Sequence, residues 1–338
     1  MSLSPPDVPL LEVRSLRVEF DAAGGFLRRR RFVAVDELSF SLCAGETLGL
    51  VGESGSGKST LARALLRLVP AAAGEVRWRG ENLFDLGRRA MREHRRAMQM
   101  VFQDALASLD PRMTIGEILA EPLRLFEPRV AWRERCLRIE RMIERVGLPR
   151  STSNRYPHEL SGGQCQRVAI GRAMMSGPEL LICDESVSSL DVSIQGQIVN
   201  LLMDLQAQSG MAMLFISHNL AVVRHLSRRV LVMYGGRLVE TAAREALFGA
   251  PLHPYTRDLL DAVPSIGAVR SSVRMAVGEA APGPSQTGCA YRWRCGRAAP
   301  ICEAERPRLE NFAADHQVAC HRPAVLGYSA AMNAESKP

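Results

Sequence analysis

The sequence predicts an α/β fold with a mostly parallel β-sheet. Apolar runs of strand length alternate with helical segments along most of the chain, which is typical of parallel strands joined by helices. The apolar run 47–51 leads directly into residues 52–59, which read G-x-x-x-x-G-K-S, and a helix with an apolar face is expected at 60–66. A strand, a glycine-rich loop and a helix in this order predict a phosphate-binding site.

Residues 52–59 carry the groups that nucleotide phosphates need. Glycines let the backbone N–H groups curl around an anion, and the start of the helix adds free N–H groups and its positive dipole end. Lys58 supplies a charge for the outer phosphates, and Ser59 supplies a hydroxyl ligand for Mg²⁺. A glycine-rich turn with a chance lysine is the alternative. The predicted binding residues are Gly52, Ser54, Gly55, Gly57, Lys58, Ser59 and Thr60.

Two further strands are expected before the run 47–51, and a short strand is expected at 75–79 after the loop. Residues 10–20 and 32–43 alternate apolar and polar positions. The segment 21–31 holds four consecutive arginines, and we expect an exposed loop there because like charges repel one another. Further on, a basic amphipathic segment leads to the apolar run 98–102, which ends at Gln103.

The middle of the chain is predicted to be helical. Within residues 114–147, apolar side chains recur at three- and four-residue spacing, and arginines and glutamates occupy the other faces. Two apolar runs of strand length follow at 180–183 and 212–216, with a helix at 194–208 between them. The segment 230–240 is expected to form a hairpin around two glycines.

Two carboxylates follow the apolar run 180–183. Asp184 and Glu185 stand at the carboxyl end of a predicted strand, as in the second half of a nucleotide site. We expect Asp184 to hold Mg²⁺ and Glu185 to orient and deprotonate the attacking water. His218 closes the next apolar run, and we expect it to contact the γ-phosphate. The alternatives are a surface Asp-Glu pair and a structural histidine.

A second anion site is predicted where a helix is expected at 165–175. A serine and two glycines precede this helix, and together with its free N–H groups they can bind an anion. One nucleotide rarely needs two such elements from the same chain. We therefore expect a head-to-tail dimer that clamps each nucleotide between the glycine-rich loop of one subunit and this motif of the other. The motif consists of Ser161, Gly162, Gly163 and Gln164.

Bulk composition is ordinary for a globular protein. The 338 residues suffice for one large domain or two smaller ones, and no apolar run reaches the length of about 18 residues that a membrane span needs. Residues 1–9 are proline-rich and polar, unlike a signal peptide, so we expect a cytoplasmic protein. The net charge of +7 permits nucleic acid or an anionic membrane as partner but selects neither.

Together these motifs resemble those of ATP-binding cassette (ABC) ATPases over about residues 10–265. The resemblance implies an α/β P-loop NTPase core of the ABC type, with an antiparallel β subdomain and a helical subdomain at about 104–165. It implies that Phe20 stacks on adenine, that Gln103 senses Mg²⁺ and the γ-phosphate, and that Asp191 communicates across the dimer. A core position for Phe20 is the alternative.

The resemblance also implies which residues act on ATP. Ser186 and Cys165 depart from the usual family pattern, but neither replaces a catalytic group, and we expect hydrolysis. The expected catalytic residues are Glu185, His218 and Gln103. The expected Mg²⁺ ligands are Ser59, Gln103 and Asp184.

Three segments resemble the oligopeptide and dipeptide importer subfamily, namely 101–112, 155–160 and 251–257, the last with its His-Pro-Tyr-Thr sequence. This implies a peripheral ATPase subunit on the cytoplasmic face of the inner membrane. Its partners would be two permease subunits, a second ATPase subunit that is a paralogue, and indirectly an extracellular solute-binding protein. Import of nickel or glutathione stays open. An ABC ATPase acting on DNA is the remote alternative, and we expect no nucleic acid partner.

Four late cysteines, Cys289, Cys295, Cys302 and Cys320, suggest a metal site. Four thiolates suit Zn²⁺ or a [4Fe–4S] cluster, and on chemistry alone zinc is favoured. The surrounding sequence resembles the cysteine-rich tail of peptide-importer ATPases, some of which carry a [4Fe–4S] cluster, and this favours iron–sulfur. Four reduced thiols are the alternative. We therefore expect an N-terminal tail, an ABC ATPase domain, a linker, a metal-binding cysteine-rich extension and a C-terminal tail at 1–9, 10–265, 266–288, 289–323 and 324–338.

Overall fold

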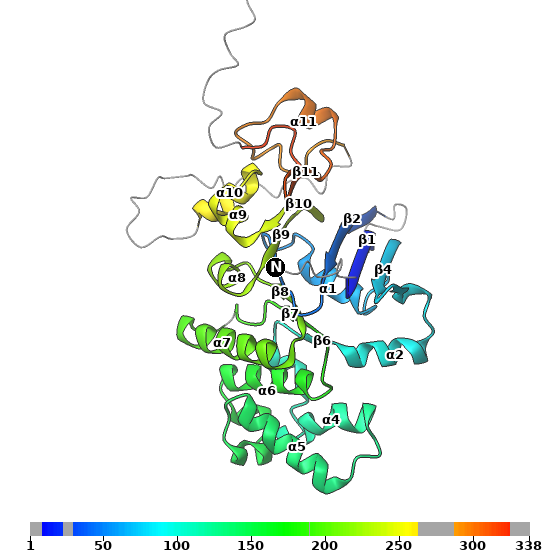
Figure 1. Cartoon of the computed structure of the whole chain (residues 1–338), viewed down its shortest axis with the longest axis vertical. Coiled ribbons are helices and arrows are strands. Elements are labelled where there is room, and N and C mark those ends of the chain that lie inside the picture. Colours follow the sequence, from blue (N-terminus) through cyan, green and yellow to red (C-terminus); the bar gives the residue numbers. More distant parts are fainter. Residues whose placement is uncertain (1–8, 23–29, 189, 263–286, 325–338) are drawn as a thin grey trace, which may run out of the picture.

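Two β-sheets and a group of helices make up the chain (Figure 1). The computed structural model describes residues 9–22, 30–188, 190–262 and 287–324. Most of both predicted tails, of the predicted linker and of the arginine-rich loop lies outside these residues. In the described part of the chain, no helix is both long and apolar enough to cross a bilayer.

The larger sheet has eight strands, and the strand before the glycine-rich loop lies near its centre. Neighbouring strands from β9 to β6 run parallel, whereas the strands from β9 to β11 pair antiparallel. The expected parallel sheet is thus confirmed for the central strands. The order is β11 (Glu310–Ala313), β12 (His316–Val318), β10 (Arg237–Ala243), β9 (Arg229–Tyr234), β3 (Thr47–Val51), β8 (Ala212–Ile216), β7 (Leu180–Asp184) and β6 (Met98–Val101).

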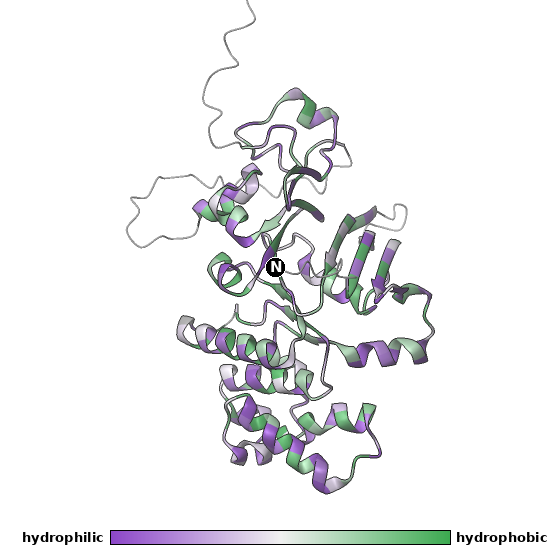
Figure 2. Ribbon diagram, in the orientation of Figure 1, coloured by the Kyte–Doolittle hydropathy of each residue, from purple (hydrophilic) through white to green (hydrophobic). Residues whose placement is uncertain are grey.

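The central strands read as continuous apolar runs because both faces of the sheet are covered. Every residue of β3, β7 and β8 is buried, and much of this region is coloured hydrophobic in Figure 2. Alternate residues pack in opposite directions. Leu180 and Ile182 join the core that contains α1 (Lys58–Leu65), whereas Leu181 and Cys183 join the core that contains α7 (Val192–Ser209).

A smaller antiparallel sheet packs on one side of α1. Leu61 and Leu65 of α1 share a core with Trp78 and with buried residues of the first two strands. This confirms the antiparallel β subdomain. The order in this sheet is β2 (Arg30–Leu42), β1 (Leu11–Ala22), β4 (Ala73–Trp78) and β5 (Glu81–Asn82).

The predicted helical insert forms a group of helices at one end of the molecule (Figure 1). Thr114 caps α4 through a reciprocal pair of hydrogen bonds with Glu117, which fixes where that helix begins. Its apolar face, including Ile118 and Leu119, is buried with Ile143 of α5. The helices between β5 and β7 are η1 (Leu83–Asp85), α2 (Arg88–Ala97), α3 (Ala105–Ser108), α4 (Ile115–Phe126), α5 (Trp132–Arg145), η2 (Arg150–Asn154), η3 (Pro157–Glu159) and α6 (Gly162–Met174).

The cysteine-rich extension joins the larger sheet directly, which the sequence did not indicate. β12 pairs antiparallel with β10, with Glu240 opposite Val318. The fully buried Glu240 carboxylate accepts hydrogen bonds from the N–H groups of Leu252 and His253, and the His316 ring lies 2.7 Å from it. The extension is therefore tied to the ATPase core by both backbone and side chains. The remaining helices are α8 (Leu220–Leu226), α9 (Arg244–Gly249), α10 (Pro254–Asp261) and α11 (Pro300–Ala304).

Candidate active site

The glycine-rich loop is shaped by close contacts with neighbouring strands. A Cβ atom on Gly52 would overlap the Met233 carbonyl oxygen of β9, and one on Gly57 would overlap the Ala34 carbonyl oxygen of β2. Gly57 also has a φ of +102° at the start of α1, which favours glycine. The loop therefore turns tightly into the helix and leaves the first helical N–H groups without partners inside the helix.

Lys58 is buried and points back into the loop. Its ammonium donates to the carbonyl oxygens of Gly52 and Glu53 at 2.9 and 2.8 Å and lies 3.6 Å from a Glu185 carboxylate oxygen. Burial lowers the pKa of Lys58, and the nearby Glu185 charge opposes this. The ammonium is thus held beside the carboxylate that the sequence predicted as the base.

Ser59 and Asp184 form the second contact between the loop and β7. The Ser59 hydroxyl donates to the Asp184 carboxylate at 2.9 Å. Burial raises the pKa of Asp184, and the hydrogen bond from Ser59 opposes this. Hydroxyl and carboxylate oxygens are ligands that Mg²⁺ accepts, with water and phosphate oxygens completing its shell. Two of the three predicted Mg²⁺ ligands, Ser59 and Asp184, therefore lie together.

Three predicted catalytic residues converge at the end of β7. The Gln103 amide donates to Glu185 at 3.1 Å, and the His218 ring lies 3.7 Å from the same carboxylate oxygen. Glu185 has a φ of 46°, a left-handed conformation that costs energy for a residue with a side chain, and its N–H donates to the Ile216 carbonyl. The Glu185 carboxylate thus lies close to three side chains, the Gln103 amide, the His218 imidazole and the Lys58 ammonium.

A cavity of about 400 Å³ lies between the loop and this cluster. Glu53 and Ser54 line it from the loop, and Glu185 and His218 line it from the strand ends. Its size is within the usual range for small-ligand sites. Glu185 and residues 52–54 of the loop thus face the same cavity.

The second predicted anion element stands apart from the first within one chain. Ser161 caps α6, accepting a hydrogen bond from the Gln164 N–H and donating its own N–H to the Gln164 side chain. Gly163 packs against Ile194, and a Cβ atom added to Gly163 would overlap that side chain. Asp191 precedes α7 without capping it through its side chain. Among the described residues, no hydrogen bond or ion pair joins this motif or Asp191 to residues 52–59.

Phe20 lies on the surface of the smaller sheet. It is 39% exposed on β1, opposite Phe32 of β2, which is 46% exposed. The core position considered for Phe20 is therefore wrong. An exposed aromatic ring is free to stack on a ligand, but Phe20 does not line the cavity beside Glu185.

The four late cysteines line one small cavity, together with His253 and His321. Burial raises the pKa of the Cys289 thiol and raises that of Cys320 to about 11. The Arg297 N–H donates to the Cys295 sulfur at 3.4 Å. Yet the described residues contain no group of three or more His, Cys, Asp or Glu side chains arranged to hold a metal ion. The metal-binding character predicted for this extension is therefore not supported.

Comparison with known proteins decides the family. Residues 35–188 match the family described as "ABC transporter", and residues 239–302 match "Oligopeptide/dipeptide transporter, C-terminal region". The chain is 48% identical to the oligopeptide transport ATP-binding protein OppF of Salmonella typhimurium, covering 92% of this chain and 95% of that protein. The chain belongs to the ABC transporter ATP-binding proteins. It is an ATPase, for which ATP with Mg²⁺ is expected.

Other relatives agree with this family. The OppF protein of Haemophilus influenzae is 45% identical, covering 95% of this chain and 99% of that protein, and a putative peptide import ATP-binding protein of Brucella ovis is 45% identical over 94% and 98%. Among solved structures, the dimeric post-hydrolysis state of the ATP-binding cassette MJ0796 bound to ADP and Pi matches with a TM-score of 0.63 and 26% identity. That match covers 69% of this chain and 98% of the cassette.

Two residues of this ABC protein contact the glycine-rich loop, and the sequence analysis missed both. The Tyr255 hydroxyl accepts a hydrogen bond from the Glu53 N–H, and Arg294 donates to both oxygens of the Glu53 carboxylate. The His-Pro-Tyr-Thr segment that holds Tyr255 served only as a subfamily marker. No local pattern marks Arg294 as a partner of a residue 241 positions away.

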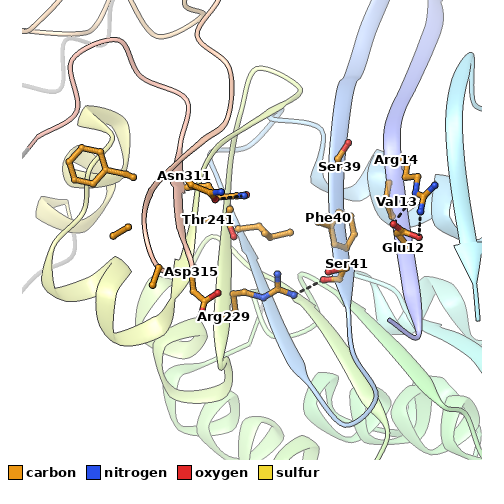
Figure 3. A pocket seen from close by; sticks show the side chains of 15 residues that line it. Glu12, Val13, Arg14, Ser39, Phe40, Ser41, Arg229, Thr241, Asn311 and Asp315 are labelled. Carbon is orange, nitrogen blue, oxygen red and sulfur yellow. Dashed lines mark hydrogen bonds and ion pairs between the residues drawn. The ribbon is translucent and has the colours of Figure 1, made fainter. Parts of the chain in front are cut away.

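Another cavity of this cassette protein is larger than the one beside Glu185 and lies elsewhere. It has a volume of about 830 Å³ and lies between β1 and β2 on one side and β10 and the β11–β12 hairpin on the other (Figure 3). None of the predicted site residues lines it. Several of its polar groups are engaged within the protein: Arg229 bonds to Glu46 and to the Ser41 carbonyl, and Gln317 bonds to Asn311.

Proposed function

We propose that this chain is the ATP-hydrolysing subunit of an importer that takes up di- and oligopeptides. The observation that carries the catalytic part is the convergence of Lys58, Gln103 and His218 on Glu185, beside the Ser59–Asp184 pair. The peptide cargo rests on the match at 239–302 and on the names of the relatives. Nickel or glutathione import by the same architecture is the alternative.

The loop would bind ATP through its backbone. The free N–H groups at the start of α1 would donate to the phosphate oxygens, and Gly55, which has open space where a Cβ atom would lie, leaves room for the phosphates to approach. Lys58 would bind the outer phosphates from the position where its ammonium is held by loop carbonyl groups. Ser59, Asp184 and Gln103 would hold Mg²⁺, which supplies charge neutralisation at the β- and γ-phosphates.

Glu185 would act as the general base. Its carboxylate takes a proton from water as the water oxygen bonds to the γ-phosphorus and the bond to the ADP oxygen breaks. The hydrogen bond from Gln103 orients this carboxylate, and the His218 ring, beside the same oxygen, would contact the γ-phosphate. The products are ADP and inorganic phosphate.

A second ATPase subunit would complete the site. Ser161, Gly162, Gly163 and Gln164 of one subunit would contact the γ-phosphate of the nucleotide held by the other, and Asp191 would lie near the same junction. Gly162 and Gly163 are at the first positions of a capped helix, whose free N–H groups suit an anion. The partner would be a paralogue, because importers of the subfamily that the sequence resembles often use two different ATPase subunits. Phe20 would stack on the adenine.

Two permease subunits would dock beside the helical subdomain, placing this chain on the cytoplasmic face of the inner membrane. An apolar groove of about 680 Å³ lies between α4 and β6, with Met100 and Phe102 on one side and Pro122 and Leu125 on the other. A permease helix would fill it. Phe102 directly precedes Gln103, whose amide bonds to Glu185. A shift of Phe102 caused by docking would therefore be transmitted through Gln103 to the proposed base. The extracellular solute-binding protein would act indirectly, through the permeases.

The four late cysteines would hold a [4Fe–4S] cluster. Four thiols face one cavity, and N–H groups that donate to cysteine sulfur stabilise thiolates and clusters. A tetrahedral zinc site would need sulfurs close together around one ion with Zn–S distances of about 2.3 Å. The described side chains have no such single-ion arrangement. The cluster is preferred over Zn²⁺ only because the surrounding sequence resembles the cysteine-rich tail of peptide-importer ATPases.

The experiment that tests the function is transport by the reconstituted complex. Proteoliposomes holding this chain, its second ATPase and the permeases would be supplied with a peptide panel, Ni²⁺ or glutathione together with the binding protein. We expect peptides to stimulate ATP hydrolysis and to accumulate. Stimulation by Ni²⁺ or glutathione alone would reassign the cargo. Iron and acid-labile sulfide in the anaerobically purified chain test the cluster, and stoichiometric zinc would contradict it.

A further inference from the structure

Glu53, within the glycine-rich loop, is held through its carbonyl oxygen, its N–H and its carboxylate. Its carbonyl oxygen accepts from the Lys58 ammonium at 2.8 Å, and its N–H donates to the Tyr255 hydroxyl at 2.8 Å. Its carboxylate accepts two hydrogen bonds from Arg294, at 2.8 and 2.9 Å. Two of these partners come from the C-terminal part of the chain. Lys58, which is proposed to bind phosphate, is thus positioned by a residue that this C-terminal part holds in place.

The Glu53 carboxylate is an unusual neighbour for a polyphosphate. Glu53 lines the same cavity as Glu185 and His218, so an unpaired carboxylate there would repel the phosphates of ATP. Arg294 pairs with it in a two-bond geometry, and each side chain is about one-third exposed. The guanidinium therefore cancels a negative charge at the mouth of the nucleotide site.

Arg294 and Tyr255 are fixed by a cluster of aromatic rings. The rings of Tyr234, Tyr255 and Tyr291 pack with centroid distances of 4.6 to 5.3 Å, and Tyr255 and Tyr291 are almost fully buried. The Arg294 guanidinium lies 5.6 Å from the centre of the Tyr291 ring. The Tyr291 hydroxyl donates to Asp258 of α10. Packing in this cluster therefore fixes the positions of Tyr255 and Arg294, the two side chains that contact Glu53.

We propose that Tyr255 and Arg294 are positioning residues of the nucleotide site, which makes the C-terminal extension part of that site. Tyr255 fixes the backbone of Glu53, and Arg294 neutralises its carboxylate, so that ATP affinity depends on both. This inference rests on the proposed role of residues 52–59 in binding ATP. Arg294 directly precedes Cys295, so the packing of the cysteine segment sets the position of the guanidinium.

The test measures ATP affinity by titration calorimetry with the full chain and a non-hydrolysable ATP analogue, together with KM and kcat. Arg294→Ala is expected to weaken binding about three- to tenfold, with kcat changed far less than KM. Adding Glu53→Gln to Arg294→Ala is expected to restore affinity, because the exposed negative charge is gone. The matched control is Arg306→Ala, which removes an arginine of the same extension that pairs with Glu37 on β2.

A second variant probes the backbone contact. Tyr255→Phe keeps the ring packing and removes the hydroxyl that accepts from the Glu53 N–H. We expect faster hydrogen exchange in a peptide spanning the loop and an ATP affinity about threefold weaker or more. Unchanged exchange and affinity would remove Tyr255 from the proposal.

Restoration of ATP affinity by Glu53→Gln in the Arg294→Ala background distinguishes a positioning role of Arg294 from a purely structural one. If Arg294→Ala binds ATP normally, or if Glu53→Gln fails to restore the double variant, Arg294 acts only structurally and the proposal is overturned. Lys58→Ala separates this result from failure of the proposed function. Normal ATP binding by Lys58→Ala would reject residues 52–59 as the nucleotide site, whereas lost binding there with a normal Arg294→Ala rejects the positioning role alone.

Discussion

The two anion-binding elements of this chain have different surroundings. Residues 52–59 are supported from three sides: Lys58 contacts the base Glu185, Ser59 contacts Asp184, and Glu53 contacts Tyr255 and Arg294. The element at 161–164 is a capped helix start whose side-chain hydrogen bonds stay within it. The difference is that the first element contacts the proposed catalytic groups within its own chain, whereas the second does not, which is why we propose that the second acts on a nucleotide held by another chain.

The largest effect is expected when Glu185, the proposed general base beside the first element, is replaced. Glu185→Gln keeps the size and the contact with Gln103 but cannot accept a proton. We expect hydrolysis to fall by about 10²- to 10⁴-fold while ATP binding is kept. Phosphate release under steady state, with ATP affinity measured beside it, checks this. Hydrolysis at the wild-type rate would remove Glu185 as the base.

A smaller effect is expected from His253. Its ring accepts a hydrogen bond from the N–H of Tyr255, whose hydroxyl contacts Glu53 of the first element. Burial lowers the pKa of His253 to about 4, against about 6.5 in an unfolded chain. As the pH falls from about 6.5 to about 4, the unfolded chain binds a proton that the folded chain does not. Folding stability is therefore lost through that window, by up to about 3 kcal/mol, and no further loss from this group follows below it.

Thermal unfolding across this pH range checks the prediction. His253→Asn retains an acceptor for the Tyr255 N–H, which His253 Nδ1 accepts at 3.0 Å, and is expected to flatten the pH dependence. The matched control is His158→Asn, an exposed histidine close to the second element, which should leave the slope unchanged. An equal slope in the wild type and His253→Asn would contradict the assignment.

The smallest effect concerns the second element. Ser161→Ala removes the cap of α6, and we expect a loss of about 1 kcal/mol of stability. In the assembled complex it should slow hydrolysis about tenfold, because one hydrogen bond to the partner's nucleotide is lost. Gln164→Glu is a useful comparison, since it keeps the reciprocal cap but adds a negative charge. Slowing by Gln164→Glu without loss of stability would separate binding from capping.

How much the sequence could predict differs between regions. The loop, Asp184 and Glu185 were predictable because each lies in a short continuous pattern, and parallel strands bring their carboxyl ends to one edge of the sheet. The contact between Glu53 and Arg294 joins residues 241 positions apart, and the buried Glu240–His316 pair joins residues 76 apart. No periodicity encodes such pairs.

The cysteine segment shows the same limit. Spacing along the chain indicated that four thiols belong together, and all four line one cavity. Spacing did not indicate that β12 would extend the sheet through β10, because residues of every type except proline can make the backbone hydrogen bonds of a ladder. Nor did it define a ligand geometry, since the described side chains are not arranged around a single ion.

The most direct test of the account is ATP affinity measured on the isolated chain for two variants side by side. Lys58→Ala, in the first element, is expected to weaken ATP binding about 10- to 100-fold, because a charged hydrogen-bond donor is lost. Ser161→Ala, in the second element, is expected to bind ATP as tightly as the wild type, since its nucleotide belongs to another chain. Equal loss of affinity in both variants would contradict the account, because both elements would then serve one nucleotide within a single chain.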